Sequence, residues 1–112
     1  MIITTQEAVA GHTVIETLGI VRGNTIRARH IGRDIMASLR NIVGGEIKEY
    51  TKMLAEAREQ ALDRMTASAS EMGADAICCV RFTTSGVMEG SAELLAYGTA
   101  VRLRRNDGTP SP

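Results

Sequence analysis

A stripe of apolar side chains at helical spacing dominates the middle of this chain. Its members follow one another by three or four positions: Ile47, Tyr50, Leu54, Ala57, Ala61, Met65, Ala69 and Met72. This spacing predicts one amphipathic helix of about seven turns. The helix is expected to end at Gly73, because glycine takes the left-handed conformation of a helix cap without a steric penalty. Since the middle of the stripe is mostly alanine, we expect the helix backbone to lie close to a sheet or a second helix.

A shorter helix is predicted immediately before Gly44-Gly45. Its apolar positions also recur by threes and fours: Ile31, Ile35, Leu39, Ile42 and Val43. The two glycines end this helix. Glu46 and Glu49 then suit the first turn of the long helix, because carboxylates are favoured at the positive end of the helix dipole.

Extended chain is predicted before these helices, at Ile2-Ile3-Thr4 and over residues 14–29. The second segment is rich in valine, isoleucine and threonine, and Gly23-Asn24 is expected to mark a bulge or turn in it. Apolar residues occupy both of its alternating sets, one with Val14, Leu18 and Ile20 and the other with Ile15 and Val21. A strand that is apolar on two sides is expected to be covered on two sides.

Two more strands are expected after Gly73, joined by a polar hairpin loop over residues 83–91. The first has one wholly apolar alternating set, formed by Ala76, Cys78, Val80 and Phe82. The second, over residues 92–104, has small side chains on one side, Ala92, Ala96, Gly98 and Ala100. Its other side has bulky ones, Leu95, Tyr97, Val101 and Leu103. The small side suits a closely packed helix. Because one long helix covers only one face of a small sheet, the bulky side predicts self-association.

Composition narrows the class of protein. The 112 residues suffice for one domain, which we place at residues 1–105, with a disordered tail at residues 106–112. Thirteen Lys plus Arg balance thirteen Asp plus Glu, and nucleic acid is not expected as a partner because its binding needs a strong positive field. No apolar run is long enough to span a membrane, and no signal peptide is recognisable at the start. We therefore expect a cytoplasmic protein whose two cysteines stay reduced.

Cys78 and Cys79 are adjacent and are the only cysteines. In a regular strand neighbouring side chains point to opposite faces, so the two thiolates of one subunit are not expected to hold the same metal ion. Packing in the core is the favoured interpretation of both, since free cysteine is among the most often buried residues. The metal hypothesis that remains is a site shared between symmetry-related subunits, each of which gives one thiolate.

Residues 22–40 carry the strongest local charge, with five arginines and one histidine against the single acid Asp34. In a ring of several copies this segment would form a belt of positive charge that can bind a phosphate or an acidic partner. Arg29, His30 and Arg33 are the candidate ligands. Ion pairs with Asp or Glu of the same or a neighbouring subunit are the alternative interpretation.

Arg58 is a further candidate ligand, because it lies beside the apolar stripe of the long helix. An arginine in this position is expected to lay its stem on the edge of the core and to pair with a carboxylate. No catalytic residue is predicted. No glycine turn of the oxyanion type adjoins either cysteine, and nothing local supports His12 or His30 as a catalytic base.

Several short motifs occur in a characteristic order over residues 2–104. They are Gly44-Gly45-Glu46, Tyr50, Ala57-Arg58, Ala61, Met65, Ala69, Gly73-Ala74-Asp75-Ala76, Arg81-Phe82 and Tyr97-Gly98-Thr99-Ala100-Val101. In order and spacing they resemble the YbjQ-like proteins, a family of small bacterial and archaeal proteins with a heavy-metal-binding label. The resemblance implies an α+β fold with a dodecin-like β-α-β-β core, in which a curved antiparallel sheet packs on one long helix, assembled as a ring-shaped homopentamer. It implies no established reaction, and valine or glycine is common in the family at the positions of Cys78 and Cys79.

Three functional hypotheses follow. The first is a non-enzymatic cytoplasmic oligomer, a scaffold or binding protein that takes a metal ion or a small anion at its subunit junctions. The second is thiol-dependent heavy-metal binding through Cys78 or Cys79. The third is an enzyme that acts on a small phosphorylated or acidic compound through the arginine-rich segment. A metal ion is the only cofactor considered, and the sequence leaves its identity open.

Overall fold

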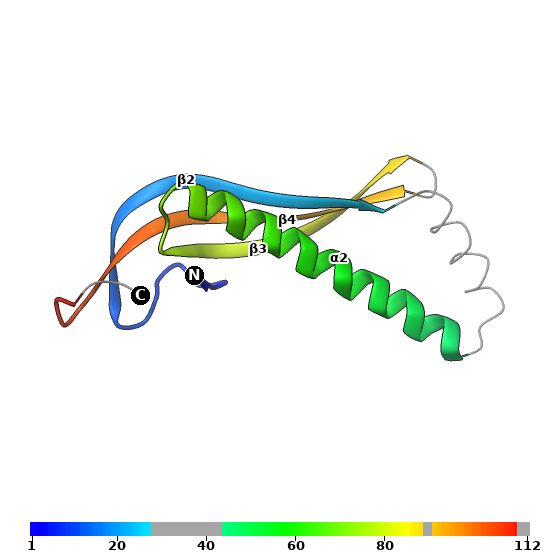
Figure 1. Cartoon of the computed structure of the whole chain (residues 1–112), viewed down its shortest axis with the longest axis horizontal. Coiled ribbons are helices and arrows are strands. Elements are labelled where there is room, and N and C mark those ends of the chain that lie inside the picture. Colours follow the sequence, from blue (N-terminus) through cyan, green and yellow to red (C-terminus); the bar gives the residue numbers. More distant parts are fainter. Residues whose placement is uncertain (28–43, 89–90, 110–112) are drawn as a thin grey trace.

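Four strands and one long helix make up the part of the chain that the computed structural model describes, residues 1–27, 44–88 and 91–109 (Figure 1). In chain order these elements are β1 (Ile2–Ile3), β2 (His12–Arg27), α2 (Gly44–Glu71), β3 (Ala76–Met88) and β4 (Ser91–Arg105). The shorter helix expected before Gly44 lies outside the described residues. Across the three described ranges, no helix combines the length and the apolar character that crossing a bilayer requires.

The strands form one mixed sheet in the order β1-β3-β4-β2. β1 pairs with β3 in parallel, whereas β4 pairs with both β3 and β2 in antiparallel orientation. The sheet is therefore mixed rather than purely antiparallel as expected. α2 lies along one face of it, which confirms the predicted α+β class with one long helix packed on a sheet (Figure 1).

The hairpin between β3 and β4 is longer than the sequence suggested. β3 continues to Met88 and stays paired with β4 as far as Ser91. The expectation of a loop from Thr83 onward is wrong, because the threonines and serine of this segment occupy exposed strand positions, where hydroxyl side chains are well tolerated.

α2 ends in a hydrogen-bonded cap at Gly73, as its sequence predicts. Gly73 has a φ of 79°. Its N–H donates to the carbonyl oxygen of Ser70 at 3.0 Å, and the N–H of Ala74 donates to that of Ala69 at 3.1 Å. This pair of bonds is a Schellman cap, which stops the helix and turns the chain toward β3.

Asp75 fixes the corner between α2 and β3. Its backbone N–H donates to the carbonyl oxygen of Val101 at 2.9 Å. Its Oδ2 accepts a hydrogen bond from the N–H of Leu103 at 2.8 Å. The Gly73-Ala74-Asp75-Ala76 motif is therefore a joint that ties the end of the helix to β4.

The alanine stripe is the face of α2 that meets the sheet, as predicted. Its four central members are fully or nearly fully buried: Ala57, Ala61, Met65 and Ala69. Ala61, Met65 and Ala69 form one core cluster with the sheet residues Val21, Ile77, Val80, Ala96 and Ala100. The carbonyl oxygen of Ala57 accepts a hydrogen bond from the Thr25 hydroxyl of β2 at 3.4 Å. The small side of β4 thus receives the helix, which confirms that part of the interpretation.

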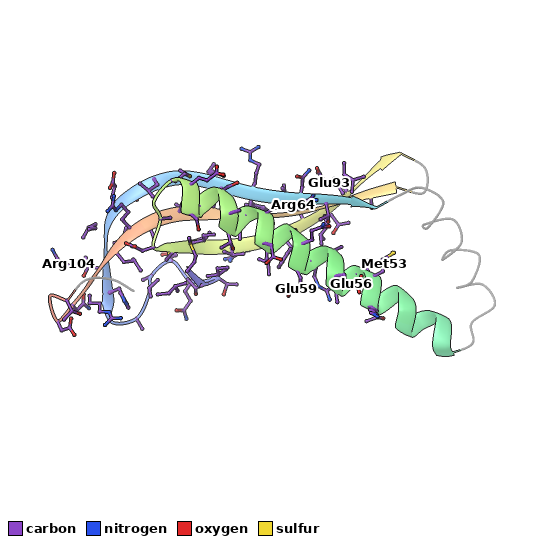
Figure 2. The ribbon with its side chains drawn as sticks, in the orientation of Figure 1. Met53, Glu56, Glu59, Arg64, Glu93 and Arg104 are labelled. Atoms are coloured by element: carbon purple, nitrogen blue, oxygen red, sulfur yellow. The ribbon has the colours of Figure 1, made fainter. Side chains whose placement is uncertain are left out.

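Gly23 is a point of close approach between β2 and α2. A Cβ built there would fall well inside van der Waals contact of the Ala61 carbonyl oxygen and the Met65 nitrogen. Beside it, Nη1 of Arg64 donates to the carbonyl oxygen of Asn24 (Figure 2). The turn considered at Gly23-Asn24 does not exist, since β2 runs straight through it. Glycine is required here because a helix backbone lies on the strand.

β2 is irregular in two places, between Val14 and Glu16 and between Thr17 and Gly19. An extra residue in a strand reverses the alternation of its side chains. Leu18 consequently packs against the core beneath α2, whereas Ile20 is 70% exposed. The expectation that Leu18 and Ile20 share one face is therefore wrong.

The sheet face away from α2, which we call the outer face, is half covered by the chain itself. At one end the segment before β2 packs Ile2 and Val9 onto a buried cluster of Ala76, Cys78, Val101 and Leu103. Farther along, the exposed fractions are 70% for Ile20, 60% for Ile26 and 38% for Tyr97. The register with β4, which sets Arg22 opposite Tyr97 and Ile26 opposite Glu93, places these three on the same side of the sheet.

Residues 106–109 form a turn against the start of β2. The N–H of Asn106 donates to the carbonyl oxygen of Gly11 at 2.9 Å, and the Thr13 hydroxyl donates to its Oδ1 at 2.6 Å. Asp107 Oδ1 accepts hydrogen bonds from the hydroxyl and the N–H of Thr109, and these bonds lower the pKa of the Asp107 carboxyl. The division into a domain of residues 1–105 and a tail stays a prediction.

Candidate functional site

A β-bulge in β3 lies at the two adjacent cysteines. Two residues of β3, Cys79 and Val80, together stand opposite the single Gly98 of β4. Cys79 has a φ of 57°, in the left-handed region, and bulges of this kind normally have glycine at that position. The regular alternation expected for this strand therefore fails at Cys79.

The bulge brings both cysteines to the outer face. Cys78 is a member of the buried cluster there, and Cys79 is half-buried against the same cluster. Val80, in contrast, belongs to the core that packs against α2. The expectation that the two cysteine side chains point to opposite faces is wrong, because the left-handed residue interrupts the pleat of the strand.

Residues 2–6, which we call the N-terminal strap, hold the bulge in place. The N–H of Cys79 donates to the carbonyl oxygen of Gln6, and that of Val80 to the carbonyl oxygen of Thr4, each at 3.0 Å. Nη1 of Arg81 donates to the carbonyl oxygen of Thr5 at 3.0 Å. The N–H groups of the bulged residues thus find their acceptors in the strap, as buried backbone groups require.

The two thiols differ in their exposure. Cys78 is only 3% exposed. Burial, followed by the repulsion of negative charge on Cys79, raises the pKa of the Cys78 thiol above its ordinary range. Cys79 Sγ is partly accessible and lies 3.9 Å from the carbonyl oxygen of Gln6. The bulge therefore presents one shielded thiol and one reachable thiol on neighbouring residues, both of them free.

His12 carries a buried polar atom that no motif of the sequence singles out. Its Nδ1 lies 2.9 Å from the carbonyl oxygen of Ala10 and donates to it, since that oxygen can only accept. Its Nε2 is buried and has no hydrogen-bond partner among the described residues. Metal-bound histidines are often oriented in this way. Within residues 1–27, 44–88 and 91–109, however, no three His, Cys, Asp or Glu side chains lie close enough to share an ion, so His12 and the cysteines do not form a three-ligand site.

The charged candidates are not gathered into one site. Arg58 is exposed on α2, and no described carboxylate lies within ion-pair distance of it. The ion pair found in the described part of the chain joins Arg102 to Glu16 at 4.0 Å, between β4 and β2. Arg29, His30 and Arg33 lie outside the described residues, and their role as ligands stays a prediction.

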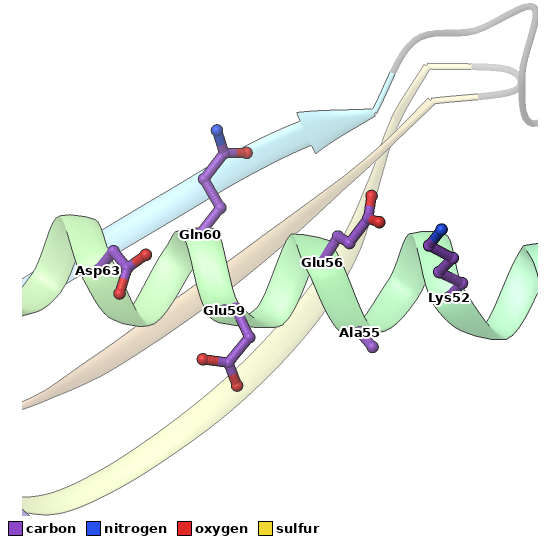
Figure 3. A pocket seen from close by; sticks show the side chains of 6 residues that line it. All are labelled: Lys52, Ala55, Glu56, Glu59, Gln60 and Asp63. Atoms are coloured by element: carbon purple, nitrogen blue, oxygen red, sulfur yellow. The ribbon is translucent and has the colours of Figure 1, made fainter.

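The hollow in Figure 3 runs along the solvent-facing side of α2. Its lining residues all belong to that helix: Lys52, Ala55, Glu56, Glu59, Gln60 and Asp63. Since a single helix lines it, the hollow is a stretch of charged helix surface rather than an enclosed pocket. None of the ligand candidates predicted from the sequence lies in it.

Comparison with known proteins identifies the family. The protein-family model YbjQ_1, described as "Putative heavy-metal-binding", matches residues 1–104. The chain belongs to the YbjQ family. The resemblance read from the sequence motifs is thereby confirmed. The family description names a kind of ligand and assigns no residue to it.

Relatives of this YbjQ protein occur in bacteria and archaea. A UPF0145 protein of Dehalococcoides mccartyi is 68% identical over 101 residues, which cover 90% of this chain and 97% of the relative. A UPF0145 protein of Archaeoglobus fulgidus is 64% identical over 104 residues, 93% of this chain and 96% of the relative. One from Methanosarcina acetivorans is 58% identical over 103 residues, 92% of this chain and 97% of the relative. The chain thus matches these relatives over nearly their whole length.

A solved structure supports the fold. The crystal structure of a protein with unknown function from the DUF74 family of Pediococcus pentosaceus superposes with a TM-score of 0.62 at 19% identity. The superposition covers 92% of this chain and 97% of the other. At this level of identity the likeness concerns the arrangement of helix and strands alone.

The left-handed conformation of Cys79 in this YbjQ protein predicts how substitutions there change the free energy of unfolding. The Cys79→Gly variant should be more stable than Cys79→Ala by about 1 kcal/mol, because any Cβ is disfavoured at a positive φ. In an ordinary strand position the order is reversed, and glycine is less stable than alanine by about 0.5–1 kcal/mol. Urea unfolding of the two variants measures the difference.

The neighbouring residue, Cys78, provides a matched pair of control variants. Cys78 lies in the same strand and does not have a positive φ, so Cys78→Ala should be more stable than Cys78→Gly. If glycine and alanine ranked in the same order at both positions, the left-handed conformation of Cys79 would be refuted.

Proposed function

We propose that this YbjQ-family protein is a non-enzymatic homo-oligomer, a ring of five subunits built on a dodecin-like β-α-β-β core, that binds a metal ion or a small anion at its subunit junctions. The proposal depends on one observation, the exposure of large apolar side chains on the uncovered half of the outer face. Ile20 and Ile26 are there more than half exposed, and Tyr97 is also exposed. Large apolar side chains gathered on one face of a small protein mark a surface that is covered in the assembled state.

The shape of the subunit supports assembly as well. Its Cα radius of gyration is 17.8 Å, whereas a compact chain of this length would have about 13 Å. The principal extents are 58 × 26 × 18 Å, and Figure 1 shows the first part of α2 reaching beyond the sheet. In so extended a molecule apolar side chains stay exposed in the described part of the chain, Leu54 of α2 included.

A ring is the arrangement that suits these surfaces. The outer face of the sheet and the projecting part of α2 are different surfaces, and contacts between unlike surfaces are head-to-tail contacts, which form a ring when the rotation between neighbours closes. The number of five subunits comes from the resemblance of the sequence motifs to YbjQ-like proteins. The junctions between subunits would then be the places where side chains of two chains meet around a ligand.

The mass of the native particle tests the assembly. Tag-free protein at micromolar concentration should give, by native mass spectrometry and by light scattering, five times 12.0 kDa, about 60 kDa. A stable monomer in this range of concentration would refute the proposed assembly. The ligand is sought by thermal shift with metal ions and small anions, since a ligand at one hundred times its Kd stabilises the folded state by about 2.7 kcal/mol.

A further inference from the structure

The side chains of two adjacent cysteines pack in one cluster on the outer face, Cys78 as a buried member and Cys79 against it. In a regular strand this would not occur, because the side chains of neighbours alternate. In β3 the left-handed residue Cys79 interrupts the alternation, and both Cys78 and Cys79 contact the cluster of Ala76, Val101 and Leu103. A single subunit therefore carries two thiols on the same face of its sheet, on adjacent residues, without the help of a second copy.

The apolar surroundings of the two thiols favour one class of metal ion. The cluster is built of the apolar residues Ala76, Val101 and Leu103 together with Cys78, and Ile2 and Val9 pack on it. Such surroundings disfavour hard cations, which take oxygen ligands. Thiolates in an apolar setting favour soft ions such as Cu(I).

The number of ligands narrows the choice further. A structural zinc site needs four ligands, and the described ranges of the chain hold no group of even three His, Cys, Asp or Glu side chains. Two thiolates alone satisfy a d¹⁰ cation that accepts low coordination. Cu(I) is therefore the natural occupant of the site, and Zn(II) is a poor one.

Access to the site is provided on one side only. Cys79 is half-buried and its Sγ is held by no stronger contact than the carbonyl oxygen of Gln6 at 3.9 Å. Cys78 behind it is almost completely shielded. An ion would reach Cys79 first and then be enclosed by Cys78, with each thiol giving its proton to the solvent as its sulfur binds.

We propose that Cys78 and Cys79 form a two-thiolate site for a soft monovalent d¹⁰ cation, with Cu(I) as its representative. The site lies within one subunit, so it does not depend on the ring. The proposal rests on the proposed function only in that both treat the protein as a binding protein. It names two residues of this chain that would bind the kind of ion in the family description.

Cu(I) binding by the reduced, tag-free protein under anaerobic conditions tests the proposal. The ion is supplied as its bicinchoninate complex, and the protein is expected to remove one Cu(I) per chain from it. X-ray absorption of the loaded protein should show two sulfur neighbours. The same titration with Zn(II) should show no stoichiometric binding.

Two variants make the test independent of folding. Cys79→Gly removes one thiol and also removes the left-handed strain, so loss of Cu(I) binding in this variant cannot be ascribed to unfolding. Cys78→Ala is expected to lose the ion as well. Retention of one Cu(I) per chain in Cys79→Gly, an uptake far below one per chain in the unaltered protein, or four-coordinate zinc in its place would each overturn the proposal.

The particle mass of the same samples separates this proposal from the proposed assembly. A protein of about 60 kDa that takes up no Cu(I) refutes the dithiol site and leaves the ring intact. A monomer that binds one Cu(I) per chain refutes the ring and supports the dithiol site.

Discussion

The Gly23→Ala variant is expected to lose about 3 kcal/mol of folding free energy, a large share of the stability of a small domain. The added Cβ would meet backbone atoms of α2, the Ala61 carbonyl oxygen and the Met65 nitrogen, together with Arg64 Cβ at 2.9 Å. A flexible side chain could turn away from the new methyl group, but a helix backbone cannot. α2 would have to move off β2, and the contacts of the buried Met65 and Ala61 would loosen with it.

Gly86→Ala is the matched control. Gly86 lies in β3, has no positive φ, and a Cβ built there meets nothing within 4 Å. Alanine at this site should leave the free energy of unfolding unchanged or raise it slightly, because it restricts the unfolded chain. Urea unfolding followed by circular dichroism compares the two variants. If Gly23→Ala were as stable as Gly86→Ala, the close contact between α2 and β2 would be disproved.

The Ile20→Glu variant is expected to abolish the proposed ring of five subunits, so that the particle mass falls from about 60 kDa to that of one subunit. Ile20 is the most exposed large apolar side chain of the described outer face, at 70%. If a second copy covers it, a carboxylate there would be buried without a partner, which costs several kcal/mol at each junction. The folded subunit itself should be little affected, since the side chain makes few contacts within it.

Gln60→Glu serves as the control for added charge. Gln60 lies on the solvent-facing side of α2 (Figure 3), so the same negative charge is placed away from the outer face. This variant should keep the mass of the unaltered protein. A ring that survives Ile20→Glu would remove the outer face from the interface, whatever the number of subunits.

The helix and its contact face could be predicted from the sequence because they depend on local spacing. The stripe from Ala57 to Ala69 identifies the buried side of α2, and the small residues Ala96 and Ala100 identify the strand that receives it. Gly73 marks the cap. Each of these features follows from the period of a regular element and from the size of side chains, both of which can be read along the chain.

The candidate site could not be predicted in the same way, because it arises where a regular period fails. Alternation in β3 assigns Cys78 and Cys79 to opposite faces only if no residue bulges out of the ladder. The bulge is held by Thr4, Gln6 and the register with β4, which are distant in sequence. A glycine at position 79 would have been a local sign of the left-handed residue, and cysteine gives no such sign.

The wrong assignment of faces in β2 also comes from a strand whose alternation is interrupted. The extra residue at Leu18, between the paired residues Thr17 and Gly19, shifts the alternation of the strand, and so Ile20 lies on the outer face rather than beside Leu18. The sequence suggests a turn at Gly23-Asn24 because glycine is typical both of turns and of strand positions that a helix backbone closely approaches. Only the packing of α2 on β2 distinguishes these two reasons.

The N-terminal strap has a consequence for the order in which the chain folds. Its hydrogen bonds join Thr5 and Gln6 to residues 73 to 76 positions later in the sequence. Contacts of such long range close only after most of the chain is available, because the entropy of the intervening loop must first be overcome. The hairpin of β3 and β4 can form earlier, with the N–H groups of Cys79 and Val80 still bonded to water. The dithiol would thus acquire its final shape in the last step of folding, when the beginning of the chain returns to the bulge.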